Sequence, residues 1–203
     1  MNGFEISFKS TVDRLAPLIE EQFVKQLPFA TAKALTDTAK QAQASLTKDL
    51  DTVFDRPTPF TKRAIGVTIA RKANLTATIF VKDVQAQYLA LEITGGTRFP
   101  KVRALVVPSK EFPLNQFGNI PQGKVKQLLS RADVFSGTIN GVGGIWQRQK
   151  KGAPKLLILW RRQAKYRPRF PFYDLVHKAA NRTFETNFKA AVVRAIATAK
   201  VKP

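Results

Sequence analysis

The chain has 203 residues, 34 of them Lys or Arg and 14 Asp or Glu, which gives a formal net charge of +20 at pH 7. This length suits one domain or at most two small ones, and a hydrophobic content of 44% is enough to build a core. The absence of Cys excludes a disulfide scaffold, Cys-ligated zinc or iron–sulfur sites and a Cys nucleophile. His177 is the single His, so a multi-His metal site within one chain is excluded as well.

Other catalytic and membrane signals are equally sparse. No apolar run approaches the ~20 residues of a membrane span, and no basic region followed by an apolar one indicates a secretory signal. The glycines at 95–96 and 141–144 lack the spacing of phosphate-binding loops and indicate turns. The four acidic residues after position 97 form no recognisable acid–base or metal motif. We therefore expect a soluble protein made inside the cell, with no enzymatic activity, cofactor or metal.

The first half of the chain predicts helices followed by a hairpin. Residues 4–8 alternate apolar and polar, which fits a short strand or the start of a helix. A helical pattern over 11–26 contains Pro17, so we expect a kink or a late start there. Pro28 then opens a longer, Ala-rich helix over 28–54. Two runs with a period of two, between Val67 and Val81, predict a β-hairpin.

The second half predicts short strands closed by one long helix. We expect helices at 84–93, 124–132 and 172–200, strands at 105–107, 134–139, 145–149 and 155–160, and a loop at 109–123. The last helix is amphipathic, and we expect its Phe184, Phe188 and Val192 to pack on the sheet. Segregated elements of this kind indicate an α+β fold. We predict a single domain over 1–203, with a mainly antiparallel sheet packed by the long N-terminal and C-terminal helices, and with 98–166 as a basic loop and strand elaboration.

The positive charge is concentrated in the second half. Residues 1–97 hold 12 basic and 10 acidic side chains, whereas residues 98–203 hold 22 basic and 4 acidic ones. Such density is unfavourable unless an anionic partner compensates it, although a solvated basic surface is the simpler alternative. The residues predicted to contact DNA or an acidic partner are Arg148, Lys150, Lys151, Lys155, Arg161, Arg162, Lys165 and Arg167.

Aromatic residues are interleaved with these cations. Trp146, Trp160 and Tyr166 could stack on unpaired bases. The alternative, which we favour for Trp160 because it ends the apolar run 156–159, is a place in the core or in an interface. No motif for sequence-specific readout accompanies them.

Two short segments resemble known proteins. Residues 88–97, Tyr-Leu-Ala-Leu-Glu-Ile-Thr-Gly-Gly-Thr, are similar to the Tyr…Glu-x-Gly-Thr segment of neck and tail-completion proteins of long-tailed bacteriophages. Residues 167–172, Arg-Pro-Arg-Phe-Pro-Phe, resemble the Arg-Pro-Phe segment before the last helix of those proteins. The Ala-rich helix and the basic second half are similar to the minor tail protein Z family. Here Gly95 is followed by a second glycine, the order around the Arg-Pro-Phe segment is altered, and about 70 residues separate the two segments where many relatives have a short link.

The resemblance implies a virion structural protein at the head–tail junction or tail end, made in the host cytoplasm. It implies a homo-oligomeric ring, six-fold or twelve-fold, that contacts portal or adaptor, tail-terminator and tail-tube proteins, with duplex DNA in its channel and no membrane. On the same basis, the residues expected at a subunit interface or as core anchors are Tyr88, Glu92, Thr97, Arg169, Phe170 and Phe172. The alternative function is non-specific nucleic-acid binding by the basic half acting alone.

Overall fold

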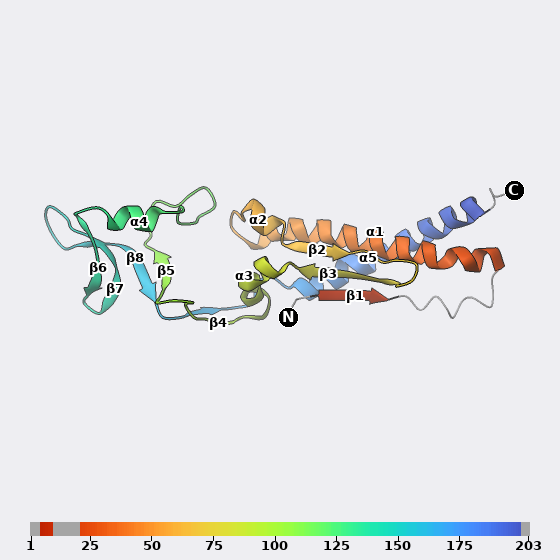
Figure 1. Ribbon diagram of the computed structural model, residues 1–203, viewed down its shortest axis with the longest axis horizontal. Coiled ribbons are helices and arrows are strands. Elements are labelled where there is room, and N and C mark those ends of the chain that lie inside the picture. Colours follow the sequence, from red (N-terminus) through yellow and green to blue (C-terminus); the bar gives the residue numbers. More distant parts are fainter. Residues whose placement is uncertain (1–4, 10–20, 200–203) are drawn as a thin grey trace. The chain divides into compact units, whose positions relative to one another are not determined.

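The computed structural model describes residues 5–9 and 21–199, and the chain divides into two compact units (Figure 1). Residues 1–93 and 169–203 form the first, which we call the helical unit. Residues 94–168 form the second, which we call the cationic unit. The region 98–166 that the sequence marks as an elaboration lies within the cationic unit.

The helical unit combines two long helices with a three-stranded antiparallel sheet. Its strands, β1 (Glu5–Lys9), β2 (Ile65–Thr68) and β3 (Thr76–Val81), are ordered β1-β3-β2, so β3 is central. Its helices are α1 (Glu21–Val53), α2 (Pro59–Lys62), α3 (Asp83–Thr94) and α5 (Phe172–Ala199). Helix α1 packs on β2 and β3, and its buried Leu46 and Leu50 join Ile79 and Val81 of β3 in the main core. The predicted hairpin is confirmed by the pairing of Val67 with Ile79.

The start of the first long helix differs from the prediction. Helix α1 already includes Glu21, and Pro28 lies inside it rather than at its beginning. A proline removes one hydrogen-bond donor from a helix. Burial of Leu27 and Ala30 on either side keeps this turn in the helix, because tertiary packing outweighs a local propensity. The part of the predicted 11–26 helix up to residue 20 lies outside the described residues.

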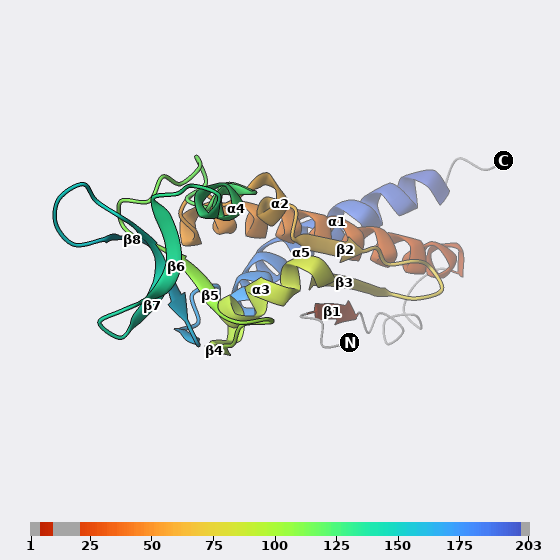
Figure 2. The same ribbon diagram turned by 60° about the vertical axis from the view of Figure 1, so that its left-hand side comes forward.

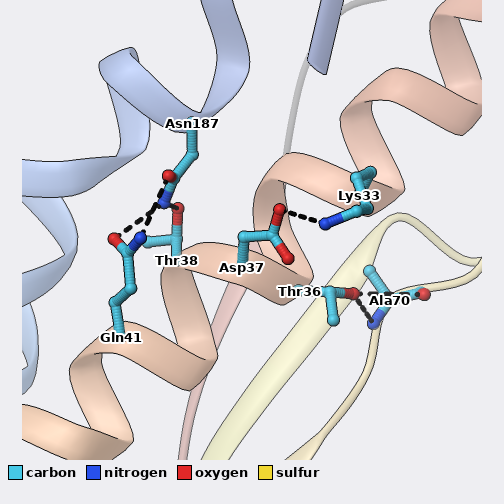
Figure 3. Close-up of polar contacts among 7 residues, drawn as sticks. All are labelled: Lys33, Thr36, Asp37, Thr38, Gln41, Ala70 and Asn187. Atoms are coloured by element: carbon cyan, nitrogen blue, oxygen red, sulfur yellow. Dashed lines mark hydrogen bonds and ion pairs between the residues drawn. The ribbon is translucent and has the colours of Figure 1, made fainter. Parts of the chain in front are cut away.

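Helices α1 and α5 pack closely along their length. Ala30 and Ala34 of α1 meet Ala191 and Ala195 of α5, and the small side chains let the two backbones approach. Asn187 of α5 fixes the register: its Nδ2 donates to Thr38 Oγ1 and to Gln41 Oε1, each at 3.0 Å (Figure 3). On another side of α1, Thr36 Oγ1 accepts a hydrogen bond from the Ala70 N–H of the hairpin at 3.2 Å (Figure 3).

The prediction that Phe184, Phe188 and Val192 pack on the sheet is wrong in its main point. All three are half-buried and lie against the alanine contact between α1 and α5. Only Phe184 also borders the main core. The reason is that α5 pairs with α1 along its length, so the apolar stripe of α5 is shared between its partner helix and the sheet.

The cationic unit is built on two antiparallel sheets (Figure 2). The larger has the order β5-β8-β7-β6, and its core contains Leu128, Val134, Ile145 and Ile158. The smaller pairs β4 with β9. The elements are β4 (Gly96–Arg98), β5 (Leu105–Pro108), α4 (Lys124–Leu129), β6 (Val134–Ile139), β7 (Val142–Gln147), β8 (Lys155–Arg161) and β9 (Ala164–Tyr166).

The fold class is α+β, as the sequence predicts, with long N-terminal and C-terminal helices and antiparallel sheets. Three differences occur in the cationic unit. Strand β7 begins at Val142, so Gly143 and Gly144, which were expected in a connection, lie within the strand, while Gly141 lies in the turn before it. Helix α4 ends at Leu129 instead of continuing to 132. Strands β4 and β9 were not predicted, because three residues are too short to show a period.

Candidate functional site

The two segments that carry the resemblance meet in space at the end of α3. The carbonyl oxygen of Glu92 accepts hydrogen bonds from the backbone N–H groups of Arg169 and Phe170, both at 2.8 Å. The Arg169 Nε donates to Glu92 Oε2 at 2.7 Å. The Glu92 side chain is 10% exposed and that of Arg169 is 56% exposed, so the ion pair lies at the edge of the core. We call this contact the Glu92–Arg169 clasp.

The aromatic residues beside the clasp anchor it to the main core. Phe170 and Phe172 are completely buried. The Phe170 ring lies 6.0 Å from that of Phe54, and the Arg169 guanidinium carbon lies 5.2 Å from the centre of the Phe54 ring. Phe54 belongs to this site although the sequence did not single it out. Its position as the last residue of the predicted Ala-rich helix, 28–54, gave no signal of such a contact.

The other members of this predicted set have separate positions. The Tyr88 hydroxyl lies 3.1 Å from Thr61 Oγ1, so Tyr88 links α3 to the turn of α2. Thr97 lies in β4 of the cationic unit and pairs with Lys165 of β9. The structure thus brings Glu92, Arg169 and Phe170 together and leaves Tyr88 and Thr97 outside the clasp.

Gly95 and Pro168 show how closely the chain leaves and re-enters the helical unit. Gly95 has a positive φ of 73°, and a Cβ at this position would lie 2.9 Å from Cδ of Pro168. An L-residue is disfavoured by such a backbone and by such a contact. Steric constraints therefore explain why position 95 is a glycine. The second glycine, Gly96, is the first residue of β4 and pairs with Tyr166 of β9.

The cationic unit carries most of the positive charge. Residues 94–168 include 15 Lys and Arg but two acidic residues, a balance of +13, whereas the remaining residues contribute +7. Both acidic side chains are already paired, Glu111 with Lys155 and Asp133 with Arg131. The hydrogen bond from Lys155 lowers the pKa of Glu111, and hydrogen bonds from Arg131 and then Gln147 lower the pKa of Asp133. The carboxylates therefore stay ionised at neutral pH and still leave a large excess of cations.

All eight cations predicted to contact DNA or an acidic partner are solvent-exposed. Two have specific intramolecular roles: Arg148 lies 4.5 Å from the centre of the Phe135 ring, and Lys155 pairs with Glu111. Lys150 and Lys151 lie in the connection between β7 and β8, while Arg161 ends β8. Arg162, Lys165 and Arg167 follow in and around β9.

Further cations of the unit were not on the predicted list. Exposed or half-buried basic side chains before β8 add to the same charge. They are Arg98, Lys101, Arg103, Lys110, Lys124, Lys126 and Arg131. The charge balance of residues 98–203 already indicated that these residues belong to the basic surface. The prediction named only residues of the segment 148–169, because basic residues are densest there.

The two tryptophans have different environments. Trp146 is 9% exposed, and its Nε1 donates to the Gly137 carbonyl at 3.2 Å, so it is part of the unit's structure. Trp160 is 37% exposed, so of the two favoured places, the core or an interface, it does not lie in the core, and a place in an interface stays a prediction. Along β8, Leu157 and Ile158 are buried, whereas Trp160 and Arg161 at the end of the strand are exposed.

Within residues 5–9 and 21–199, no three His, Asp or Glu side chains gather as a metal site. None of the described helices has both the length and the apolar character to cross a membrane. Comparison with known proteins gives no further guide, since no family model, curated protein or solved structure matches this chain.

Proposed function

We propose that the protein is a structural subunit of a bacteriophage neck or tail end, which acts in tail completion or head–tail joining as part of a ring around the DNA path. The observation that carries this proposal is the Glu92–Arg169 clasp. It joins the two segments that resemble tail-completion proteins, although 77 positions separate the two residues. The two short segments thus meet in one hydrogen-bonded arrangement at the edge of the core, beside the buried Phe170.

The architecture supports a building role. Helices α1 and α5 form a long, closely packed pair, which gives a ring subunit a stiff wall. Cyclic symmetry would repeat the +13 cationic unit around the ring and present it to DNA phosphates or to acidic neighbours.

Electron microscopy tests this proposal. The purified protein, alone and mixed with phage neck and tail proteins, should give closed rings, and the protein should be present in finished virions. A chain that stays monomeric with all of these partners, and that is absent from virions, would contradict the proposal.

A second candidate function is non-specific nucleic-acid binding by the cationic unit. The observation in its favour is the +13 balance of residues 94–168, in which both carboxylates are already paired. Affinity for duplex DNA should fall with salt, with a slope of about −0.9 in log–log form for each phosphate contact.

Charge reversal distinguishes the two functions. Arg161→Glu with Arg162→Glu and Lys165→Glu should abolish DNA binding if nucleic-acid binding is the function. If the protein is a tail subunit, the same variant should chiefly impair assembly or DNA passage. A matched control reverses exposed cations of the helical unit, Lys40→Glu with Lys48→Glu, which should leave DNA binding nearly unchanged. A flat response to salt would exclude the second function.

A further inference from the structure

In the larger sheet of the cationic unit, one row of neighbouring residues across the four strands includes a solvent-exposed aromatic ring. Trp160 of β8 pairs with Val106 of β5, and the two side chains are 37% and 48% exposed. On the other side of Trp160 lies Gly143 of β7, where a Cβ would be 3.7 Å from Trp160 Cε3. Gly143 in turn pairs with the exposed Thr138 of β6. We call these four residues the Trp160 row.

The position of this row explains why the ring stays accessible. Side chains two residues apart in a strand share a face, so Trp160 lies on the same face as Ile158. Ile158 is completely buried with Ile145 and Leu128 in the core of the unit. On this face of β8, the core of the unit therefore ends at Ile158, and Trp160 lies beyond it. Because Gly143 has no side chain, the neighbouring position of β7 places no side chain beside the ring.

The charges around the row favour a polyanion as its occupant. Arg162 lies just past the end of β8, two positions after Trp160, Arg103 precedes β5, and both are exposed, whereas Arg161 lies on the opposite face of β8. The unit offers no acidic side chain that is not already in an ion pair. An uncharged apolar partner would leave this charge uncompensated, whereas a nucleic-acid backbone would neutralise it.

We propose that the Trp160 row is a binding platform for single-stranded nucleic acid, with an unpaired base stacked on the Trp160 ring and its phosphates held by the neighbouring arginines. The proposal deepens the second candidate function, on which it rests, by naming the strand form that is bound. In a duplex, paired and stacked bases do not present a free face, so an exposed indole adds affinity for single strands alone.

The experiment compares two ligands on the full-length chain. Binding of an oligo(dT) of about 12 nucleotides, a length within the range that single-strand-binding folds cover, is measured beside that of a duplex of equal length. Trp160→Ala should weaken oligo(dT) binding by roughly 5- to 150-fold, the equivalent of one lost stack. Duplex binding should change by less than about two-fold, because it depends on phosphate contacts. Phe60→Ala, which removes an exposed aromatic ring from the helical unit, is the control and should change neither.

A second variant keeps the test valid if Trp160→Ala disturbs the sheet. Trp160→Phe preserves an aromatic face and should retain most of the affinity for oligo(dT). Since the chain has two tryptophans and Trp146 is buried, the quenching that oligo(dT) causes in the unmodified protein should disappear in Trp160→Phe.

The outcomes separate the inference from the function on which it rests. Equal loss of both ligands in Trp160→Ala, or oligo(dT) binding without quenching of Trp160, overturns the platform and leaves general binding intact. If the unmodified protein binds neither ligand at low salt, the platform and the second candidate function both fail.

Discussion

At the residue scale, the point where the chain leaves α3 has strict steric requirements. Gly95 combines a positive φ with the close approach of Pro168, whereas Gly141 has a similar φ of 77° and no neighbour within 4 Å of a Cβ. A comparison of substitutions at these two positions therefore distinguishes the cost of backbone strain from the cost of steric contact.

We expect Gly95→Ala to destabilise the protein more than Gly141→Ala does. The backbone strain, common to both, costs roughly 1–2 kcal/mol. At Gly95 the contact with the Pro168 ring adds to it, because a Cβ–Cδ separation of 2.9 Å forces one of the two residues to move. Urea unfolding curves of both variants measure the difference. An equal loss of unfolding free energy in both variants would show that the Pro168 ring moves aside at no cost in stability.

The Glu92–Arg169 clasp makes a second prediction at this scale. Glu92→Gln keeps the shape of the side chain but removes the charge that faces Arg169, and we expect a loss of roughly 1–3 kcal/mol in the free energy of unfolding. Arg169→Leu should also destabilise, since its guanidinium both donates to Glu92 and covers Phe54. The double variant should lose less than the two single losses added together, because each removes the same interaction. A strictly additive result would refute the coupling.

Individual residues were predictable where local chemistry decided their role. The exposure of the eight selected cations follows from the cost of burying a charge. The partner of Glu92 did not follow from spacing or periodicity, since 77 positions separate it from Arg169, and only the resemblance placed both in one set. The exposure of Trp160 did not follow from the sequence, because the apolar run 156–159 does not show where along β8 the buried part of the strand ends.

At the scale of elements, the contact between α1 and α5 depends on small side chains. Ala34 is completely buried there, and Ala44 of the same helix is exposed. We expect Ala34→Leu to cost about 1–3 kcal/mol, because the added methylenes force the helices apart. Ala44→Leu should stay near neutral, since Ala and Leu have similar helix propensity. Thermal unfolding followed by circular dichroism measures both. A neutral Ala34→Leu would mean that the helices are not held at this distance.

The helices and the hairpin were predictable because each contains several repeats of its period. The apolar stripes of α1 and α5 extend over many turns, and one proline does not obscure them. What α5 packs against was not predictable, because a stripe indicates which face is buried and does not identify the surface that covers it. The short strands β4 and β9 were not predictable, because each is defined only by its pairing with the other, which lies far away in the sequence.

At the scale of the whole molecule, the two units have separate cores. The main core contains residues of the helical unit alone, and the core around Ile145 and Ile158 contains residues of the cationic unit alone. The chain passes from one unit to the other at 93–94 and returns at 168–169. Because Glu92 hydrogen-bonds to the backbone of Arg169, the two crossing points are adjacent within the helical unit.

The helical unit should therefore fold without the cationic unit. We expect a variant in which a short Gly-rich turn replaces residues 95–167 to unfold cooperatively, with a midpoint within about 5 °C of that of the full chain, a shift equivalent to roughly 1 kcal/mol. No residue of the main core is removed, and the Glu92–Arg169 clasp closes the new turn.

The same variant loses 15 cations and two carboxylates, so its net charge falls to +7 and its affinity for DNA should disappear. Circular dichroism melts and a DNA-binding assay check the two expectations separately. A variant that unfolds without cooperativity would show that the clasp does not suffice to close the helical unit, and a folded variant that still binds DNA would place the binding surface outside residues 95–167.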